Sequence, residues 1–378
     1  MGLSMTISSD LPPSHFPYFG QLTGLRFIAA LGVVLCHFEG VIGQVERLHF
    51  WYVLGGNGVA LFFVLSGFVI AGNITSGTYS YRQYAVHRFA RIVPVYWLSL
   101  LVTLLLFLIG GWQYSSVASG EIFSDELILS FFLNFFALQA WFPNTVIQQF
   151  WNAPAWSISS ELFFYLCAPL FLARLGSSKA MFLYLWVLTG LLLIGYHWTA
   201  AGILGDRSIW LHAYPIRLPV FGLMAFLYGM VLYRYYRRKS YEKKDHTLAI
   251  LVTITLIVFI NWLISEAQGT HGWDMKAISL FYLAAIPCYT LLIYLFIYDK
   301  GIFSQFLNLP FMVLLGNASY SLYLFHWIAL LVIMRHLDLP IGLAYTCIYL
   351  LTLILFSLCI YLGFEKPLKQ QIIARLSK

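Results

Sequence analysis

Residues 309–334, LPFMVLLGNASYSLYLFHWIALLVIM, contain no aspartate, glutamate, lysine or arginine. As a helix, a run of about 18 or more predominantly apolar residues is long enough to cross the ~30 Å hydrocarbon core of a bilayer. Other stretches also lack these four residue types: 58–72, 92–109, 181–196, 218–233, 247–264, 277–298 and 341–364. The pattern predicts an all-α protein, a polytopic bundle of membrane-spanning helices.

The composition of the whole chain favours the same fold class. Of the 378 residues, 61% are hydrophobic and 10% are charged, whereas soluble domains carry about 25% charged residues. A soluble core cannot bury that much apolar surface, which excludes a water-soluble enzyme, a disordered chain and a fibre. The net charge of +7 gathers in short clusters such as 82–91 and 234–244. These clusters are typical of cytoplasmic loops rather than of a nucleic-acid-binding surface.

The basic clusters also predict the topology. We expect about ten transmembrane helices: 22–43, 53–73, 91–110, 157–174, 180–199, 214–234, 247–265, 277–298, 312–334 and 341–363. Residues 126–142 (ELILSFFLNFFALQAWF) are apolar as well, but a crossing there would move the cluster 234–244 outside. We therefore expect this segment to be re-entrant or interfacial, and both chain termini to be cytoplasmic.

The chain divides into three predicted parts: a flexible tail at 1–20, one membrane domain at 21–367 and a basic cytoplasmic tail at 368–378. The five cysteines lie in or beside apolar stretches, without CxxC or Cys/His spacing, so no metal site is predicted. We find no internal repeat, which argues against a transporter built from two related halves.

Arg26 and His37 are polar residues within the first predicted helix. Their separation of eleven residues corresponds to ~1100° of rotation, within ~20° of whole turns, and to a rise of ~16 Å. They therefore share one helix face at different depths. An intramembrane arginine usually faces the bundle interior or a cavity. Without a function, Arg26 would reach the headgroups by snorkelling and His37 would be packed in the core.

Further basic and small residues have both structural and functional interpretations. Arg88 and Arg91 are neighbours on one helical face, where they either set the topology or bind phosphates with their guanidinium groups. Arg217, near two prolines, is another candidate intramembrane cation. The pair Ser66–Gly67 favours close helix packing, because both residues are small.

Two more segments combine polar and apolar residues. Glu161 follows Ser157 at the start of the predicted helix 157–174. Its carboxylate either interacts favourably with the dipole at the helix N-terminus or pairs with a buried cation. Ser319, Tyr323 and His326 are spaced i, i+4 and i+7 and form one polar stripe. A lone membrane histidine is more often a packed residue than a catalyst, and three polar groups on one face add a functional site as the alternative.

Five segments occur in a recognisable order: LTGLRFIAALGVVLCHF (22–38), GVALFFVLSGFVI (58–70), RFARIVPVYW (88–97), WSISSELFFYL (156–166) and GNASYSLYLFH (316–326). Together with the closing FEKP at 364–367, they resemble acyltransferase family 3, the multispanning acyltransferases that modify bacterial surface glycans and small molecules. The resemblance covers nearly the whole chain. It implies a stand-alone O-acetyltransferase of the bacterial cytoplasmic (inner) membrane, without the hydrolase-like domain that many relatives carry.

This resemblance implies transfer of an acetyl group from cytosolic acetyl-CoA to a hydroxyl of an exopolysaccharide or surface sugar, or of its lipid-linked repeat, without a metal. By motif it assigns the essential histidine to His37, the preceding basic residue to Arg26, the Arg-x-x-Arg pair to Arg88 and Arg91, and the WSLSVEE-like element to Trp156, Ser157 and Glu161. Leu162 stands where the family has a second acidic residue, which argues against a mechanism that needs two carboxylates there.

We expect the CoA phosphates to lie against Arg88 and Arg91 and the pantetheine arm to pass Arg26. The thioester would then lie near His37, which acts as general base on the acceptor hydroxyl; an acetyl-histidine intermediate is the variant left open. The acceptor would enter from outside, through a tunnel continuous with the donor site. The residues expected to line this outer chamber are Trp156, Ser157, Tyr323 and His326.

Two other function classes remain compatible with these residues. One is a glycan transporter or flippase that uses His37, Glu161 and His326 as a proton relay. The other is a non-catalytic membrane assembly or sensor protein. Consumption of an acyl thioester separates the enzyme from both.

Overall fold

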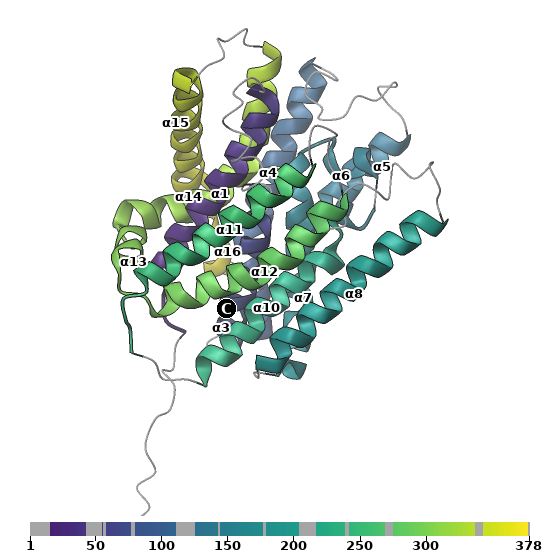
Figure 1. The fold of residues 1–378 in the computed structure, drawn as a ribbon. Coiled ribbons are helices and arrows are strands. Elements are labelled where there is room, and N and C mark those ends of the chain that lie inside the picture. Colours follow the sequence, from purple (N-terminus) through teal and green to yellow (C-terminus); the bar gives the residue numbers. More distant parts are fainter. Residues whose placement is uncertain are drawn as a thin grey trace, which may run out of the picture.

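The computed structural model describes residues 16–42, 55, 58–76, 80–110, 125–142, 144–176, 179–203, 217–238, 242–268, 275–336 and 343–376. Within these ranges the secondary structure is helical, apart from an isolated bridge between Lys244 and Asp299. The long helices pack against one another in a single bundle (Figure 1). The predicted all-α class is confirmed.

Each of the ten predicted spans coincides with a long helix. These helices are α1 (Gly20–Ile42), α3 (Gly58–Thr75), α4 (Tyr81–Gly110), α7 (Trp156–Arg174), α8 (Lys179–Ile203), α10 (Pro219–Arg237), α11 (Thr247–Gln268), α12 (Met275–Tyr298), α14 (Pro310–His336) and α15 (Leu343–Ile360). Among the described residues, six helical stretches are long and apolar enough to cross a membrane, and shorter apolar helices accompany them. The chain is a multi-pass membrane protein.

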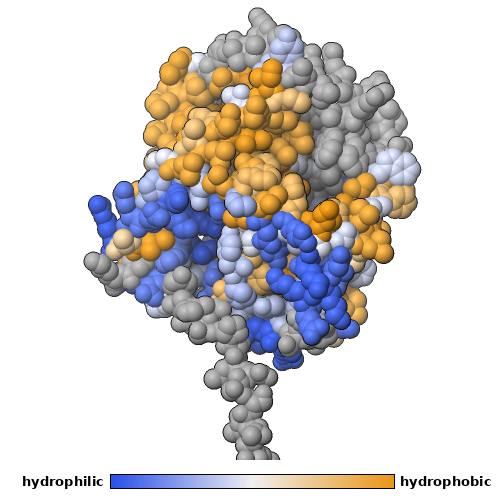
Figure 2. Space-filling view, turned by 90° about the vertical axis from the view of Figure 1, so that its left-hand side faces the viewer, coloured by the Kyte–Doolittle hydropathy of each residue, from blue (hydrophilic) through white to orange (hydrophobic). Residues whose placement is uncertain are grey.

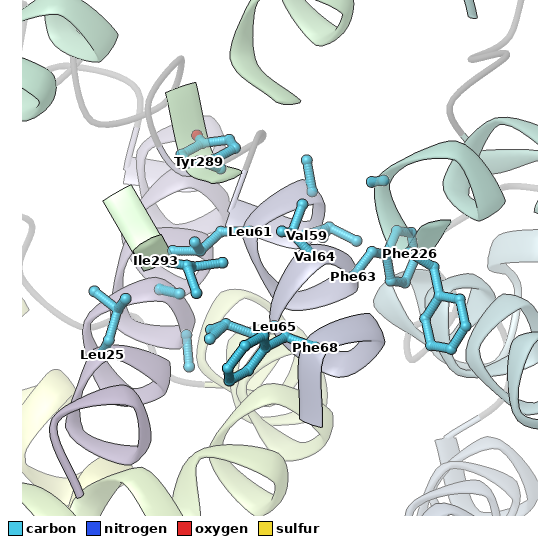
Figure 3. Packing of buried hydrophobic residues seen from close by; sticks show 14 of the residues in the cluster. Leu25, Val59, Leu61, Phe63, Val64, Leu65, Phe68, Phe226, Tyr289 and Ile293 are labelled. Atoms are coloured by element: carbon cyan, nitrogen blue, oxygen red, sulfur yellow. The ribbon is translucent and has the colours of Figure 1, made fainter. Parts of the chain in front are cut away.

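The core is built around α3, which is buried along most of its length. Phe63 and Val64 of α3 lie beside Phe226 of α10, and Leu25 of α1 belongs to the same buried cluster (Figure 3). A Cβ atom on Gly67 would lie 1.9 Å from the backbone oxygen of Phe226. The backbones of α3 and α10 are therefore in direct contact, and Gly67 has the packing role expected from the sequence.

The apolar segment at 126–142 does not form a membrane-spanning helix. It contains α5 (Asp125–Phe135), a turn at Ala137 and the short helix η2 (Gln139–Trp141), followed by α6 (Thr145–Gln149) and η3 (Ala153–Ala155). The eleven residues of α5 rise only ~16 Å, about half the hydrocarbon thickness. Buried hydrogen bonds hold the segment: Asn134 donates to the Ile147 oxygen at 2.8 Å, and Gln139 donates to the Ala155 oxygen at 3.0 Å.

The C-terminal segment predicted as a tail is helical. The last long helix continues from α15 through a π-helical turn, η7 (Tyr361–Glu365), into α16 (Lys366–Leu376). α13 (Ile302–Leu307) is a short helix that precedes α14. α16 packs against α4, the helix that carries Arg88 and Arg91. The described part of the predicted tail is therefore helical as far as Leu376.

One face of the molecule is divided into an apolar and a hydrophilic region (Figure 2). The apolar region occupies the upper part of this view, and α15, which lies on this side in Figure 1, exposes Ile348, Leu351 and Leu355. Exposed aliphatic side chains of this kind suit contact with lipid tails. The hydrophilic region at the lower end suits contact with water and headgroups.

Candidate active site

A cavity lies among α1, α3, α4, α7 and α14. Several residues singled out in the sequence line it together: Arg26, Arg88, Arg91, Ser157, Glu161, Ser319 and Tyr323. The cavity is formed where the polar faces of these five helices meet, so it brings together groups that are far apart in the sequence. Its remaining lining is largely aliphatic and aromatic, as is typical of a small-molecule site.

Three guanidinium groups share this cavity, and we call Arg26, Arg88 and Arg91 the arginine cluster. Arg88 and Arg91 lie one turn apart on α4, as the i, i+3 spacing predicts. The guanidinium of Arg88 lies 6.0 Å from the ring centre of Tyr84 and 5.9 Å from that of Tyr165, within cation–π range. Its buried Nε has no hydrogen-bond partner among the described residues, which leaves a donor for an anionic ligand.

Glu161 provides negative charge in the cavity and interacts electrostatically with Arg26 and Arg88. Its Oε1 accepts a hydrogen bond from Ser66 Oγ at 2.5 Å and another from the hydroxyl of Tyr165. It lies beyond the first turn of α7, so the structure supports the pairing interpretation over that of a carboxylate at the helix N-terminus. The described lining of the cavity contains one carboxylate, Glu161, and three guanidinium groups, so the cavity favours an anion.

His37 and His326 form a hydrogen-bonded pair, which we call the histidine pair. His37 Nδ1 and His326 Nε2 are 2.8 Å apart, and the rings stack with centres 5.0 Å apart. The ring of Trp327 packs edge-on against His37 at 5.0 Å. His326 is fully buried. A span of 289 positions separates the two histidines, so helix periodicity alone does not predict this contact.

The hydrogen bonds fix the tautomer of each histidine. His326 Nδ1 lies 2.6 Å from the backbone oxygen of Tyr323, and because a carbonyl oxygen only accepts, this nitrogen carries the proton. In neutral His326 the Nε2 atom is then an acceptor, and His37 donates to it from Nδ1. Neutral His37 is left with its lone pair on Nε2, the atom that can accept a proton from a substrate.

Tyr323 connects the histidine pair to the cavity. Its backbone oxygen accepts from His326, while its hydroxyl donates to the Pro154 oxygen at 2.9 Å and lies 2.8 Å from Ser157 Oγ. The described lining of the cavity includes Tyr323 and Ser157 but neither histidine. A continuous tunnel from the arginine cluster to His37 therefore stays a prediction.

Two other sequence candidates have different surroundings. The ring of Trp156 is buried and packs edge-on against Phe63, with centres 6.4 Å apart, and it is not among the described lining residues of the cavity. Arg217, at the start of α10, interacts electrostatically with His37 and Tyr323. Residues 111–124, between α4 and α5, lie outside the described residues.

Sequence reasoning missed the two cavity residues that donate hydrogen bonds to Glu161. Ser66 was interpreted only as a packing residue, yet its hydroxyl donates to Glu161. Tyr165 donates to the same carboxylate from one turn further along α7, and its i+4 spacing from Glu161 is the signal that points to it. The described residues hold no group of three or more histidine, cysteine, aspartate or glutamate side chains suited to a metal ion.

Comparison with known proteins assigns the family. Residues 19–362 match the family model Acyl_transf_3, described as an acyltransferase domain. The chain is 35% identical over 156 residues to Acyltransferase MdmB of Streptomyces mycarofaciens, covering 40% of this chain and 38% of that protein. It is 23% identical over 333 residues to O-acetyltransferase OatA of Staphylococcus aureus, covering 82% of this chain and 50% of that protein.

The chain thus spans half or less of the length of these curated relatives. No solved structure matches it significantly. The family match nevertheless covers most of the chain and includes the helices that form the cavity and the histidine pair. The protein belongs to acyltransferase family 3.

Proposed function

We propose that the protein is a membrane O-acetyltransferase that moves an acetyl group from cytosolic acetyl-CoA to a hydroxyl of a surface or exopolysaccharide sugar, or of its lipid-linked repeat. The observation that carries the proposal is the cavity in which the arginine cluster faces Glu161. Tyr323 lines this cavity, and its backbone oxygen accepts a hydrogen bond from His326 of the histidine pair. Family membership supports acyl transfer, and the name of the staphylococcal relative supports acetyl transfer to oxygen.

The arginine cluster binds the phosphates of the donor in this proposal. Guanidinium groups form paired hydrogen bonds with phosphate oxygens, and they stay charged when partly buried. The unpartnered Nε of Arg88 and the excess of guanidinium groups over carboxylate support this assignment. The pantetheine arm then follows the cavity past Arg26 towards Ser157 and Tyr323.

His37 is the general base of the proposed transfer. Its Nε2 takes the proton of the acceptor hydroxyl as the hydroxyl oxygen attacks the thioester carbonyl carbon. The carbon–sulfur bond then breaks, and the imidazolium returns the proton to the CoA thiolate. His326 holds the reactive tautomer, and the positive charge of Arg217 favours the oxyanion that develops near His37. In the alternative mechanism, His37 itself carries the acetyl group as a covalent intermediate. Trapping an acetylated enzyme would reveal this variant.

The proposed location is the bacterial cytoplasmic membrane, with both termini in the cytoplasm. The basic clusters at 82–91 and 234–244 support this orientation. It places the arginine cluster near the cytosolic supply of the charged donor. The acceptor then approaches from the opposite side, and only the acetyl group crosses the membrane.

Radiolabelled acetyl-CoA added to inverted membrane vesicles tests the proposal. We expect label to enter polysaccharide or lipid-linked sugar, and His37→Ala to lower the rate by about 10²–10⁴-fold, the usual loss for a general base. His246→Ala is the matched control, because His246 lies in the segment between α10 and α11, away from the cavity. Label incorporation that does not depend on His37 would refute the mechanism. Glycan movement without thioester consumption would favour the transporter class.

A further inference from the structure

The C-terminal helix α16 brings charge to the donor side of the cavity. The π-helical turn η7 joins α15 to α16, and α16 then packs against α4, which carries Arg88 and Arg91. A π-helical turn inserts extra backbone into a helix and is often found at functional sites. Directly after this turn, α16 lies against α4, the helix of Arg88 and Arg91.

Glu365, the last residue of the π-helical turn, anchors this arrangement. Its side chain is buried, and its Oε2 accepts a hydrogen bond from the buried Ser321 Oγ at 2.7 Å. Ser321 lies on α14, the helix that also supplies Ser319 and Tyr323 to the cavity. The carboxylate interacts electrostatically with Arg91. Glu365 therefore ties the start of α16 to the cavity wall.

Lys369 lies one helical turn beyond Glu365, on the same face of the helix. Its side chain is partly buried, and its ammonium interacts electrostatically with all three members of the arginine cluster. Among the described residues in this region, four cations thus face two carboxylates, Glu161 and Glu365. Partly buried like charges repel one another, and a polyanion bound between them removes that repulsion.

We propose that Lys369 is a fourth phosphate-binding cation of the donor site and that α16 forms part of its cytoplasmic entrance. The inference rests on the proposed function, in which the ligand is the phosphorylated nucleotide end of an acyl-CoA. A lysine ammonium is a compact charge on a flexible stem. It suits a terminal phosphate that lies outside the arginine cluster, such as the 3′-phosphate of CoA.

Binding of CoA, dephospho-CoA and pantetheine to the purified protein in lipid nanodiscs tests this role. We expect Lys369→Gln to weaken CoA binding about tenfold, a typical loss for one charged hydrogen bond. Binding of pantetheine, which has no nucleotide phosphate, stays unchanged. Lys369→Arg restores most of the CoA affinity. Lys366→Gln is the matched control, because Lys366 is exposed on the same helix, and it leaves CoA affinity within about twofold of the wild type.

The comparison of ligands assigns the phosphate. If Lys369 contacts the 3′-phosphate, wild type and Lys369→Gln bind dephospho-CoA with the same affinity. If Lys369→Gln weakens binding of both CoA and dephospho-CoA, the contact lies at the pyrophosphate. Both results support the proposal. Equal CoA affinity of the Lys369→Gln and Lys366→Gln proteins would overturn it, as would an equal loss of pantetheine binding. Wild-type protein that binds no CoA would overturn the proposed function and this inference together.

Discussion

Replacing His326 tests the tautomer that the structure assigns to His37. His326→Leu removes the acceptor at 2.8 Å from His37 Nδ1 and leaves a buried N–H group unsatisfied, or releases the imidazole to its other tautomer. An unsatisfied buried donor costs about 1–3 kcal/mol. If this energy is lost from the transition state, kcat falls by about 5- to 150-fold. KM for acetyl-CoA should not change, because the arginine cluster is untouched.

His326→Gln is the conservative counterpart, because an amide oxygen can still accept from His37 and an amide nitrogen can still donate to the Tyr323 oxygen. Thioester consumption at several pH values measures kcat for both variants, and thermal unfolding in detergent confirms that both are folded. We expect the glutamine variant to keep most of the activity and the leucine variant to lose it. Equal kcat for the two folded variants would show that His326 only fills space, and the assigned tautomer would then have no role in catalysis.

Three further predictions concern the donor, the core and the topology. Arg88→Ala should weaken CoA binding by about tenfold or more while leaving pantetheine binding unchanged; calorimetry showing unaltered CoA affinity would leave Arg88 with a topological role only. Gly67→Val should prevent stable folding, since even a Cβ atom at position 67 would lie 1.9 Å from backbone. Gly195→Ala should be tolerated, because a Cβ atom there meets open space. Detergent-solubilised yield and unfolding temperature distinguish the two variants. In a cysteine-free background, a cysteine at Arg237 should resist an impermeant thiol reagent on intact cells and one at Asp125 should react, and the reverse pattern would invert the assigned orientation.

The sequence predicts the membrane helices well because the bilayer restricts which segments can cross it. Charge-free runs identify eight of the ten long helices described, since a spanning segment must satisfy its backbone internally and largely exclude charge. The other two, α1 and α7, carry Arg26 and Glu161 within apolar sequence. The helix ends are less predictable. α4 begins at Tyr81, ten residues before the predicted start at 91, because its first turns are polar and continue beyond the apolar run. Hydropathy likewise gives no reason to continue a helix from 363 to Leu376.

The candidate site was predictable where its residues share one helix. The spacing of Arg88 and Arg91, which both line the cavity, follows from helical periodicity. The common face of Arg26 and His37 stays a prediction, because only Arg26 is among the described lining residues. Contacts between helices cannot be predicted in this way, because a single sequence does not show which helices pack side by side. The histidine pair, the Ser66–Glu161 hydrogen bond and the approach of α16 to the arginine cluster all belong to this second group.

The backbone contact at Gly67 determines how Ser66 is held against Glu161. The neighbouring peptide of α3 rests directly on the backbone of α10, so the position of the Ser66 hydroxyl depends on main-chain contact rather than on the size of side chains around it. The serine keeps its register with the carboxylate as long as the two backbones stay in this contact. A single added methyl group at position 67, by contrast, separates the two helices and moves one wall of the cavity with them.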